Sequence, residues 1–163
     1  MNGKIAKCGV FTALAIIISS LERLVPLQAI IPLPGIKLGL SNCVILFVLL
    51  NFGYLSALSV LIIKCVIVSV LFSGITSLAF SLSGGILALT GMYLLLRFRN
   101  LFSLCGISVF GAAMHNVGQI LAAALVLKSI YIFAYLPVLL LISVVTGLLT
   151  GLLSEIIYKR IEV

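Results

Sequence analysis

The fold is decided by one apolar stretch in the middle of the chain, Tyr54-Leu-Ser-Ala-Leu-Ser-Val-Leu-Ile-Ile-Lys64-Cys-Val-Ile-Val-Ser-Val-Leu-Phe72. It holds a single charged residue and is about as long as the roughly 20 residues that a helix needs to cross a bilayer. Similar stretches fill most of the 163-residue chain, which is 64% hydrophobic and only 8% charged. A soluble domain carries roughly a quarter charged residues, so we expect an integral membrane protein.

Five further apolar stretches flank this one, and each predicts a helix. The six expected helices cover about 5–24, 36–51, 54–72, 77–96, 101–127 and 130–158. The connections between them are short, so consecutive helices should be antiparallel neighbours. No clear small-x-small cleavage site follows the first stretch, which we interpret as a retained helix and not as a signal peptide. The sequence predicts an all-α, polytopic, six-transmembrane-helix bundle, with 1–163 as a single integral membrane domain.

The charged residues predict the orientation of this bundle. The net charge is +7, and there is no Asp. If all six helices span, one side holds twice as many basic residues as the other: Lys4, Lys7, Arg97, Arg99, Lys159 and Arg160 against Arg23, Lys37 and Lys128. The positive-inside rule then places both termini in the cytoplasm. Because the basic residues form no stripe on a soluble face, nucleic acid is not an expected partner.

Lys64 is the most informative single residue. A charge near the middle of a bilayer costs about 2.5–3.5 kcal/mol, so it should face a cavity or a partner. No acidic residue lies in the core of a predicted helix, and the nearest candidate is Glu22 at the end of the first. Two interpretations stay open: Lys64 snorkels or bonds to backbone carbonyls, or it awaits an anionic ligand.

A second polar group lies in the stretch 101–127. Gln119 lies four residues after His115 and three after Asn116, which places the three side chains in one polar patch of a helix. They could hydrogen-bond a neighbouring helix, at about 0.6 kcal/mol per pair, or bind a ligand. With one His and no Cys or carboxylate on this face, we expect no metal site.

Small residues recur at helix-packing spacing in two places. The last predicted helix holds Gly147 and Gly151, and the first holds Gly9 and Ala13. Such faces let helices approach closely in lipid. Each could pack within the chain or dock onto a partner membrane protein.

Several catalytic signatures are missing. There is no GxxxxGK[ST] for ATP, no GxSxG and no HExxH. Without Asp, an Asp-rich magnesium-diphosphate site cannot be built, and the three Glu all lie near helix ends. We therefore expect neither an enzyme nor a bound cofactor.

Four segments together carry a family resemblance. They are Leu21-Glu22-Arg23-Leu-Val-Pro26, Pro32-Leu-Pro34-Gly35-Ile-Lys37-Leu-Gly39-Leu-Ser-Asn42, Ser81-Leu-Ser-Gly-Gly85 and His115-Asn116-Val-Gly118-Gln119. In this order they resemble the heptaprenyl diphosphate synthase component I family, also called the Gx transporter family. That family is similar to the substrate-binding S components of energy-coupling factor (ECF) importers.

The resemblance implies a ligand cavity in the outer half of the bundle, under a lid loop after the first helix. Here the lid would hold Pro26, Pro32, Pro34 and Gly35. It also implies that Gly9 and Ala13 dock onto a transmembrane T subunit, and that two ATP-binding cassette ATPases supply the energy. The setting would be a bacterial cytoplasmic membrane.

The leading hypothesis is an S component that captures a small anionic, amphipathic compound, such as a vitamin, an isoprenoid or a quinone precursor. Lys64 would supply the counter-charge. The residues expected to orient or attract the ligand are Asn42, His115, Asn116, Gln119 and Lys37. The alternatives are a noncatalytic membrane subunit of a prenyl diphosphate synthase or quinone-pathway enzyme, and a secondary carrier that uses His115 for protons.

Overall fold

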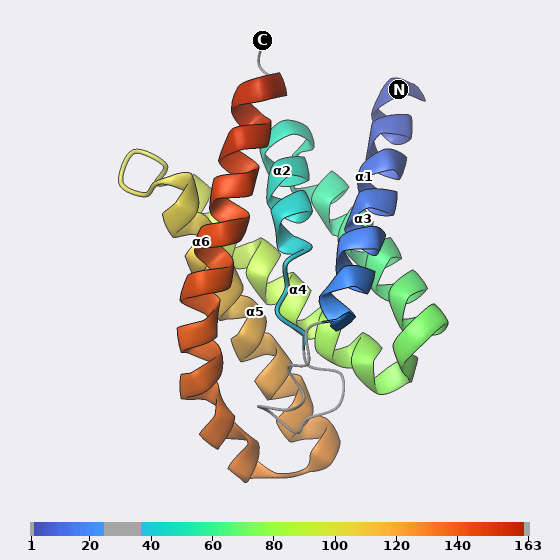
Figure 1. The fold of residues 1–163 in the computed structure, drawn as a ribbon, viewed down its shortest axis with the longest axis vertical. Coiled ribbons are helices and arrows are strands. Elements are labelled where there is room, and N and C mark those ends of the chain that lie inside the picture. The colour runs from blue at the N-terminus through green and yellow to red at the C-terminus, as the bar shows by residue number, and fades with distance from the viewer. Residues whose placement is uncertain (1, 25–36, 162–163) are drawn as a thin grey trace.

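The computed structural model describes residues 2–24 and 37–161, which are almost entirely helical and contain no β-strand (Figure 1). The α-helices are α1 (Asn2–Leu21), α2 (Asn42–Phe52), α3 (Tyr54–Val68), α4 (Gly74–Leu96), α5 (Leu104–Leu127) and α6 (Leu136–Ile161). Three short elements extend them: the 3-10 turn η1 (Glu22–Leu24), the π turn η3 (Ser69–Ser73) and the 3-10 turn η4 (Ile130–Tyr135). The all-α prediction is confirmed.

Five helical segments are long and apolar enough to cross a membrane: Gly3–Leu21, Tyr54–Phe72, Gly74–Leu96, Leu104–Leu127 and Ile130–Tyr158. Large apolar side chains are exposed along them, as expected for surfaces that face lipid. This makes the chain an integral membrane protein by length and composition.

The second helix departs from the prediction of six spanning helices. It was expected over 36–51, but α2 begins at Asn42 and has 11 residues. At 1.5 Å per residue it is about 16 Å long, roughly half of the hydrocarbon core. The reason is Gly39, whose φ of 79° lies outside the right-handed helical region. The chain turns there, with Asn42 N–H donating to the Gly39 carbonyl at 2.9 Å. The count of six spanning helices is therefore not confirmed.

The remaining helix ends shift by a few residues, for local reasons. α5 begins at Leu104 and not at 101, because the Ser103 side chain caps it by accepting from Gly106 N–H at 3.1 Å. α4 begins earlier than predicted, at Gly74, where φ is 75° and the chain turns back from η3. The stretch predicted as one helix over 130–158 opens with the 3-10 turn η4.

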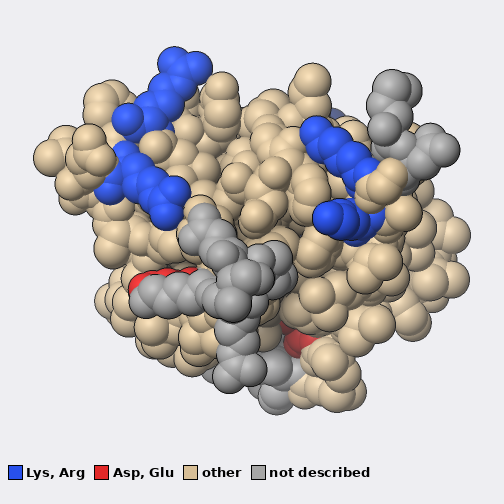
Figure 2. All heavy atoms as spheres, turned by 90° about the horizontal axis from the view of Figure 1, so that it is seen from above, with Lys and Arg blue, Asp and Glu red and all other residues tan. Residues whose placement is uncertain are grey.

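The start of α1 and the end of α6 lie at the same end of the bundle, and the connection between α4 and α5 lies toward that end (Figure 1). Lys4 and Lys7 lie in the first turns of α1, and Arg97 and Arg99 follow α4; all four are exposed. Figure 2, which looks onto this end, shows Lys and Arg side chains gathered on it. The basic side of the sequence thus corresponds to one end of the fold, and its assignment to the cytoplasm stays a prediction.

The closest packing is between α4, α5 and α6. Gly118 of α5 lies against the backbone of Gly84 in α4, where an added Cβ would come within 2.7 Å of the Gly84 Cα atom. On the other side of α5, Gly151 of α6 lies equally close to the Cys105 Cα atom. The small-residue pair Gly147 and Gly151 therefore packs within the chain, which was one of the two interpretations that the sequence left open.

Candidate functional site

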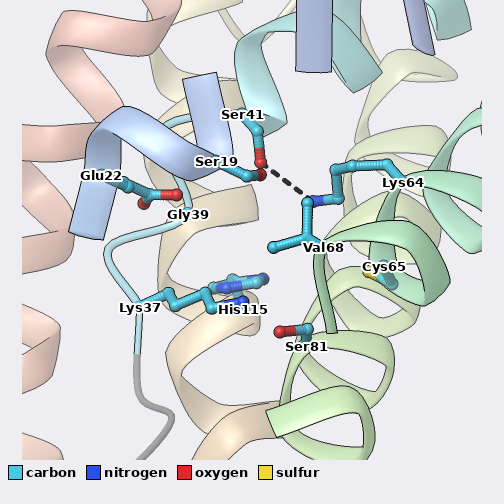
Figure 3. Close-up of a pocket in the computed structure, with 10 residues that line it drawn as sticks. All are labelled: Ser19, Glu22, Lys37, Gly39, Ser41, Lys64, Cys65, Val68, Ser81 and His115. Atoms are coloured by element: carbon cyan, nitrogen blue, oxygen red, sulfur yellow. Dashed lines mark hydrogen bonds between the residues drawn. The ribbon is translucent and has the colours of Figure 1, made fainter. Parts of the chain in front are cut away.

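A small cavity lies where η1, the segment 37–41, α3, α4 and α5 meet (Figure 3). Most of its lining side chains are polar: Ser19, Glu22, Lys37, Gly39, Ser41, Lys64, Cys65, Val68, Ser81 and His115. Its volume of about 10 Å³ is the room of about one water molecule. Binding of an organic molecule here would require the walls to move apart.

Lys64 enters the cavity from the middle of α3. Its side chain is 5% exposed and its ammonium donates to the Ser41 hydroxyl at 2.9 Å. Ser41 stands at the N-cap position of α2 but makes no capping bond with its side chain, which leaves its oxygen to accept from Lys64. Lys64 thus faces a cavity, and that an anionic ligand binds it there stays a prediction.

Glu22 faces Lys64 across the same space (Figure 3). It is 6% exposed, and its carboxylate accepts a hydrogen bond from Leu40 N–H at 2.7 Å. Burial raises the pKa of this carboxyl, while the Leu40 N–H and the positive charges of Lys64 and Lys37 act in the opposite direction. The sequence indicated Glu22 as the nearest acidic candidate to pair with Lys64, but not as a residue of the ligand site. Sequence reasoning missed that η1 turns the residue inward, although Glu22 is the only acidic residue before position 155 of the sequence.

Gln119 holds the backbone of Lys37, the first residue of the segment 37–41. Its amide oxygen accepts from Lys37 N–H at 3.1 Å and its amide nitrogen donates to the Lys37 carbonyl at 2.9 Å. The same nitrogen bonds Nε2 of His115, one turn earlier on α5. Because an amide nitrogen only donates, Nε2 must accept, and the neutral ring carries its proton on Nδ1. His115 and Gln119 thus share one face, as their spacing predicted.

Gly39 fits between these side chains only because it lacks a Cβ. An added Cβ would lie 2.8 Å from Cδ2 of His115 and 2.9 Å from the amide nitrogen of Asn42. Together with its positive φ, this makes Gly39 the residue through which the segment 37–41 lies directly on α5.

The two asparagines are placed differently. Asn42 adjoins the cavity through Gly39, and its amide nitrogen is buried without a hydrogen-bond partner among the described residues. Asn116 points to α6, where its amide nitrogen donates to the Leu139 carbonyl at 2.8 Å. The structure therefore brings His115, Gln119, Lys37 and Lys64 together with Asn42 at the edge, and it turns Asn116 toward a neighbouring helix.

The other predicted site residues lie elsewhere. Pro26, Pro32, Pro34 and Gly35, predicted to form a lid, fall outside the described residues. Gly9 and Ala13 are exposed on α1, and no described atom beyond the neighbouring backbone of α1 lies within 4 Å of a Cβ built on Gly9. Among residues 2–24 and 37–161, no group of three or more His, Cys, Asp or Glu could hold a metal ion.

The cavity and fold define a class: an all-helical integral membrane protein with a charged, polar site buried between its helices. Within that class, the chain belongs to the family described as heptaprenyl diphosphate synthase component I, whose pattern matches residues 11–157. Those residues include every described member of the cavity lining. Comparison with curated proteins and with solved structures gave no match.

Proposed function

We propose that this protein is a substrate-binding S component of an ECF-type importer, which captures a small anionic, amphipathic organic compound. The observation that carries the proposal is the buried Lys64 ammonium in a cavity lined by hydroxyl and imidazole groups. An ionisable side chain inside a membrane-spanning helix is costly, and it marks a ligand or ion site by default.

The cavity offers more hydrogen-bond donors than the fold uses. Lys64 has three N–H groups, of which one is directed at Ser41. The Ser81 hydroxyl is buried without a partner among the described residues, and Figure 3 shows it beside His115 on the cavity wall. A carboxylate or another compact anion, which only accepts hydrogen bonds, would satisfy these donors together.

The surface of α1 supports the proposal that this protein docks onto another membrane subunit. α1 is the least buried of the five candidate spans, and its small residues Gly9 and Ala13 face away from the bundle. A flat, small-residue face lets another helix approach closely. In the proposed importer this face docks onto the T subunit, and two ATP-binding cassette ATPases supply the energy. The basic end of the bundle then lies in the cytoplasm of a bacterium, with both termini.

The name of the family suggests another role, as a noncatalytic membrane subunit of a prenyl diphosphate synthase. One experiment separates the two. The protein is purified gently from its own membrane, and native mass spectrometry identifies the subunits and small molecules that accompany it. We expect ATP-binding cassette ATPases and a bound organic anion. A prenyltransferase with an empty bundle would reject the importer.

A further inference from the structure

The cavity holds two opposite charges that are not in direct contact. Lys64 and Glu22 point into it from opposite sides (Figure 3). Lys64 donates a hydrogen bond to Ser41, and Glu22 accepts one from the Leu40 backbone. Both side chains are more than nine-tenths buried. A buried charge without compensation is costly, so each of these groups lowers the cost of the other through space.

An anion that bound Lys64 would change this balance. It would bring a second negative charge close to Glu22, in a cavity where Lys64 is buried and Lys37 is only half-buried. Two anions in one buried site cannot both stay ionised cheaply. Proton uptake by Glu22 relieves this repulsion. A protonated Glu22 remains within reach of Leu40 N–H and can donate to the ligand instead of repelling it.

We propose that Glu22 is the resident counter-anion of Lys64, and that an anionic ligand takes its place as one proton transfers from solvent to Glu22. This proposal rests on the ligand cavity of the proposed function, and it names the head group as a single negative charge such as a carboxylate. A diphosphate would bring two or more charges to a site with one fully buried cation. Glu22 is thereby a specificity-determining residue.

The other titratable groups that line the cavity are Lys37, from the segment before α2, His115 from α5 and Cys65 from α3; α4 contributes only Ser81. Glu22 is the one carboxyl group among these lining residues. Burial already raises the pKa of Glu22 from its ordinary value of 4.5. A bound anion raises that pKa further, so the complex binds more protons than the free protein and anion affinity increases as the pH falls.

Cys65 allows a test that needs no knowledge of the natural ligand. The full-length protein is made with Cys65 as its one cysteine, by Cys8→Ser, Cys43→Ala and Cys105→Ser. Cys65 is then labelled with two methanethiosulfonates of similar size, an anionic sulfonatoethyl and a cationic trimethylammonioethyl reagent, and with a smaller neutral methyl reagent. The ratio of the anionic to the cationic rate reports the charge of the cavity, because the ionisation of the thiol affects both rates equally.

We expect this ratio to increase as the pH is lowered from about 8 to about 5. Glu22→Gln, which keeps the shape of the side chain, should raise the ratio at least about tenfold at neutral pH and remove its pH dependence. Lys64→Gln should lower the ratio below that of the unmodified cavity. Geranic acid should protect Cys65 from labelling better than geranyl diphosphate does. In Glu22→Gln, the difference in protection between the two compounds should become smaller.

Three results would overturn the proposal. The first is a ratio that Glu22→Gln leaves unchanged. The second is a pH dependence that persists in Glu22→Gln, which would assign the titration to His115. The third is a Cys65 that none of the three reagents modifies in the folded protein, because the cavity would then admit no small ion. The first two results leave the importer proposal standing, because they concern only the role of Glu22. The third would also remove the ligand cavity that the importer needs, and co-purification with ATPases tests the importer independently.

Discussion

α1 and α6 carry small residues at the same spacing, and the structure uses them in opposite ways. Gly147 and Gly151 of α6 lie against the backbone of α5, where an added Cβ would meet Val109 and Cys105. Gly9 and Ala13 of α1 are exposed, with nothing near a Cβ built on Gly9. The comparison shows that the spacing indicates close helix approach, whereas the identity of the approaching helix depends on the rest of the fold.

The largest loss of stability is expected when a large side chain replaces a glycine of the α6 pair Gly147 and Gly151. In Gly147→Leu, the new side chain would overlap the backbone of Val109, which cannot move without separating α5 from α6. We expect the free energy of unfolding to decrease by about 3 kcal/mol or more, measured as reversible denaturation in detergent micelles.

Val144→Leu is the matched control for that experiment, because Val144 is exposed on the same helix and has room for the larger side chain. Its effect should stay within about 0.5 kcal/mol. Equal stability of Gly147→Leu and Val144→Leu would show that α5 and α6 are not in backbone contact.

A smaller loss of stability is expected at Gly39, in the segment 37–41 that precedes α2. Gly39→Ala adds a Cβ at positive φ and directly against His115. Gly53→Ala adds one at a φ of 83° but in open space, so it isolates the cost of the backbone conformation. We expect a loss of about 1–3 kcal/mol from the conformation alone, and a larger loss in Gly39→Ala.

The difference between these two variants measures how tightly the segment 37–41 lies on α5. It can be obtained from paired thermal denaturation curves. If the two variants lose equal stability, Gly39 does not contact His115, and the cavity is more open than the structure shows.

Still smaller changes in stability are expected when two polar residues of α5 are replaced, and hydrogen exchange distinguishes their roles. Asn116 bonds to α6 and Gln119 bonds to the backbone of Lys37. Asn116→Leu should cost about 0.6 kcal/mol of stability and leave amide hydrogen exchange at Lys37 unchanged. Gln119→Leu should accelerate that exchange because the partner of the amide is removed. Unchanged exchange at Lys37 in Gln119→Leu would contradict the pair of hydrogen bonds between Gln119 and the Lys37 backbone.

Much of this fold follows from composition and hydropathy. The α3 stretch around Lys64 and the spans near it were predictable because apolar runs of that length have one stable form in lipid. The spacing of His115 and Gln119 also placed them on one face. Such patterns depend only on local periodicity, which the sequence displays directly.

Three features depend on contacts between distant segments, and sequence patterns do not encode them. The shortness of α2 follows from the backbone angle of Gly39, which looks in sequence like any glycine at a helix start. Glu22 enters the cavity because Leu40 N–H, 18 residues later, lies before α2 and donates its hydrogen bond to the Glu22 carboxylate. Asn116 turns from the cavity to α6 because the Leu139 carbonyl lies there.

The smallest effect on stability, and the most informative for function, is expected on the exposed face of α1. Gly9→Leu and Ala13→Leu should each change the free energy of unfolding by less than about 0.5 kcal/mol, because both positions are exposed and none of the described residues 2–24 and 37–161 buries them. In the proposed importer, the same substitutions should strongly reduce co-purification of the ATPases, since a bulky side chain prevents close approach of the T subunit. Leu14→Ile, on an exposed α1 residue outside this pair, serves as control. A stable protein that loses its partner assigns the motif to docking. A destabilised one would mean that α1 packs against this chain as α6 does, and the contrast between the two helices would disappear.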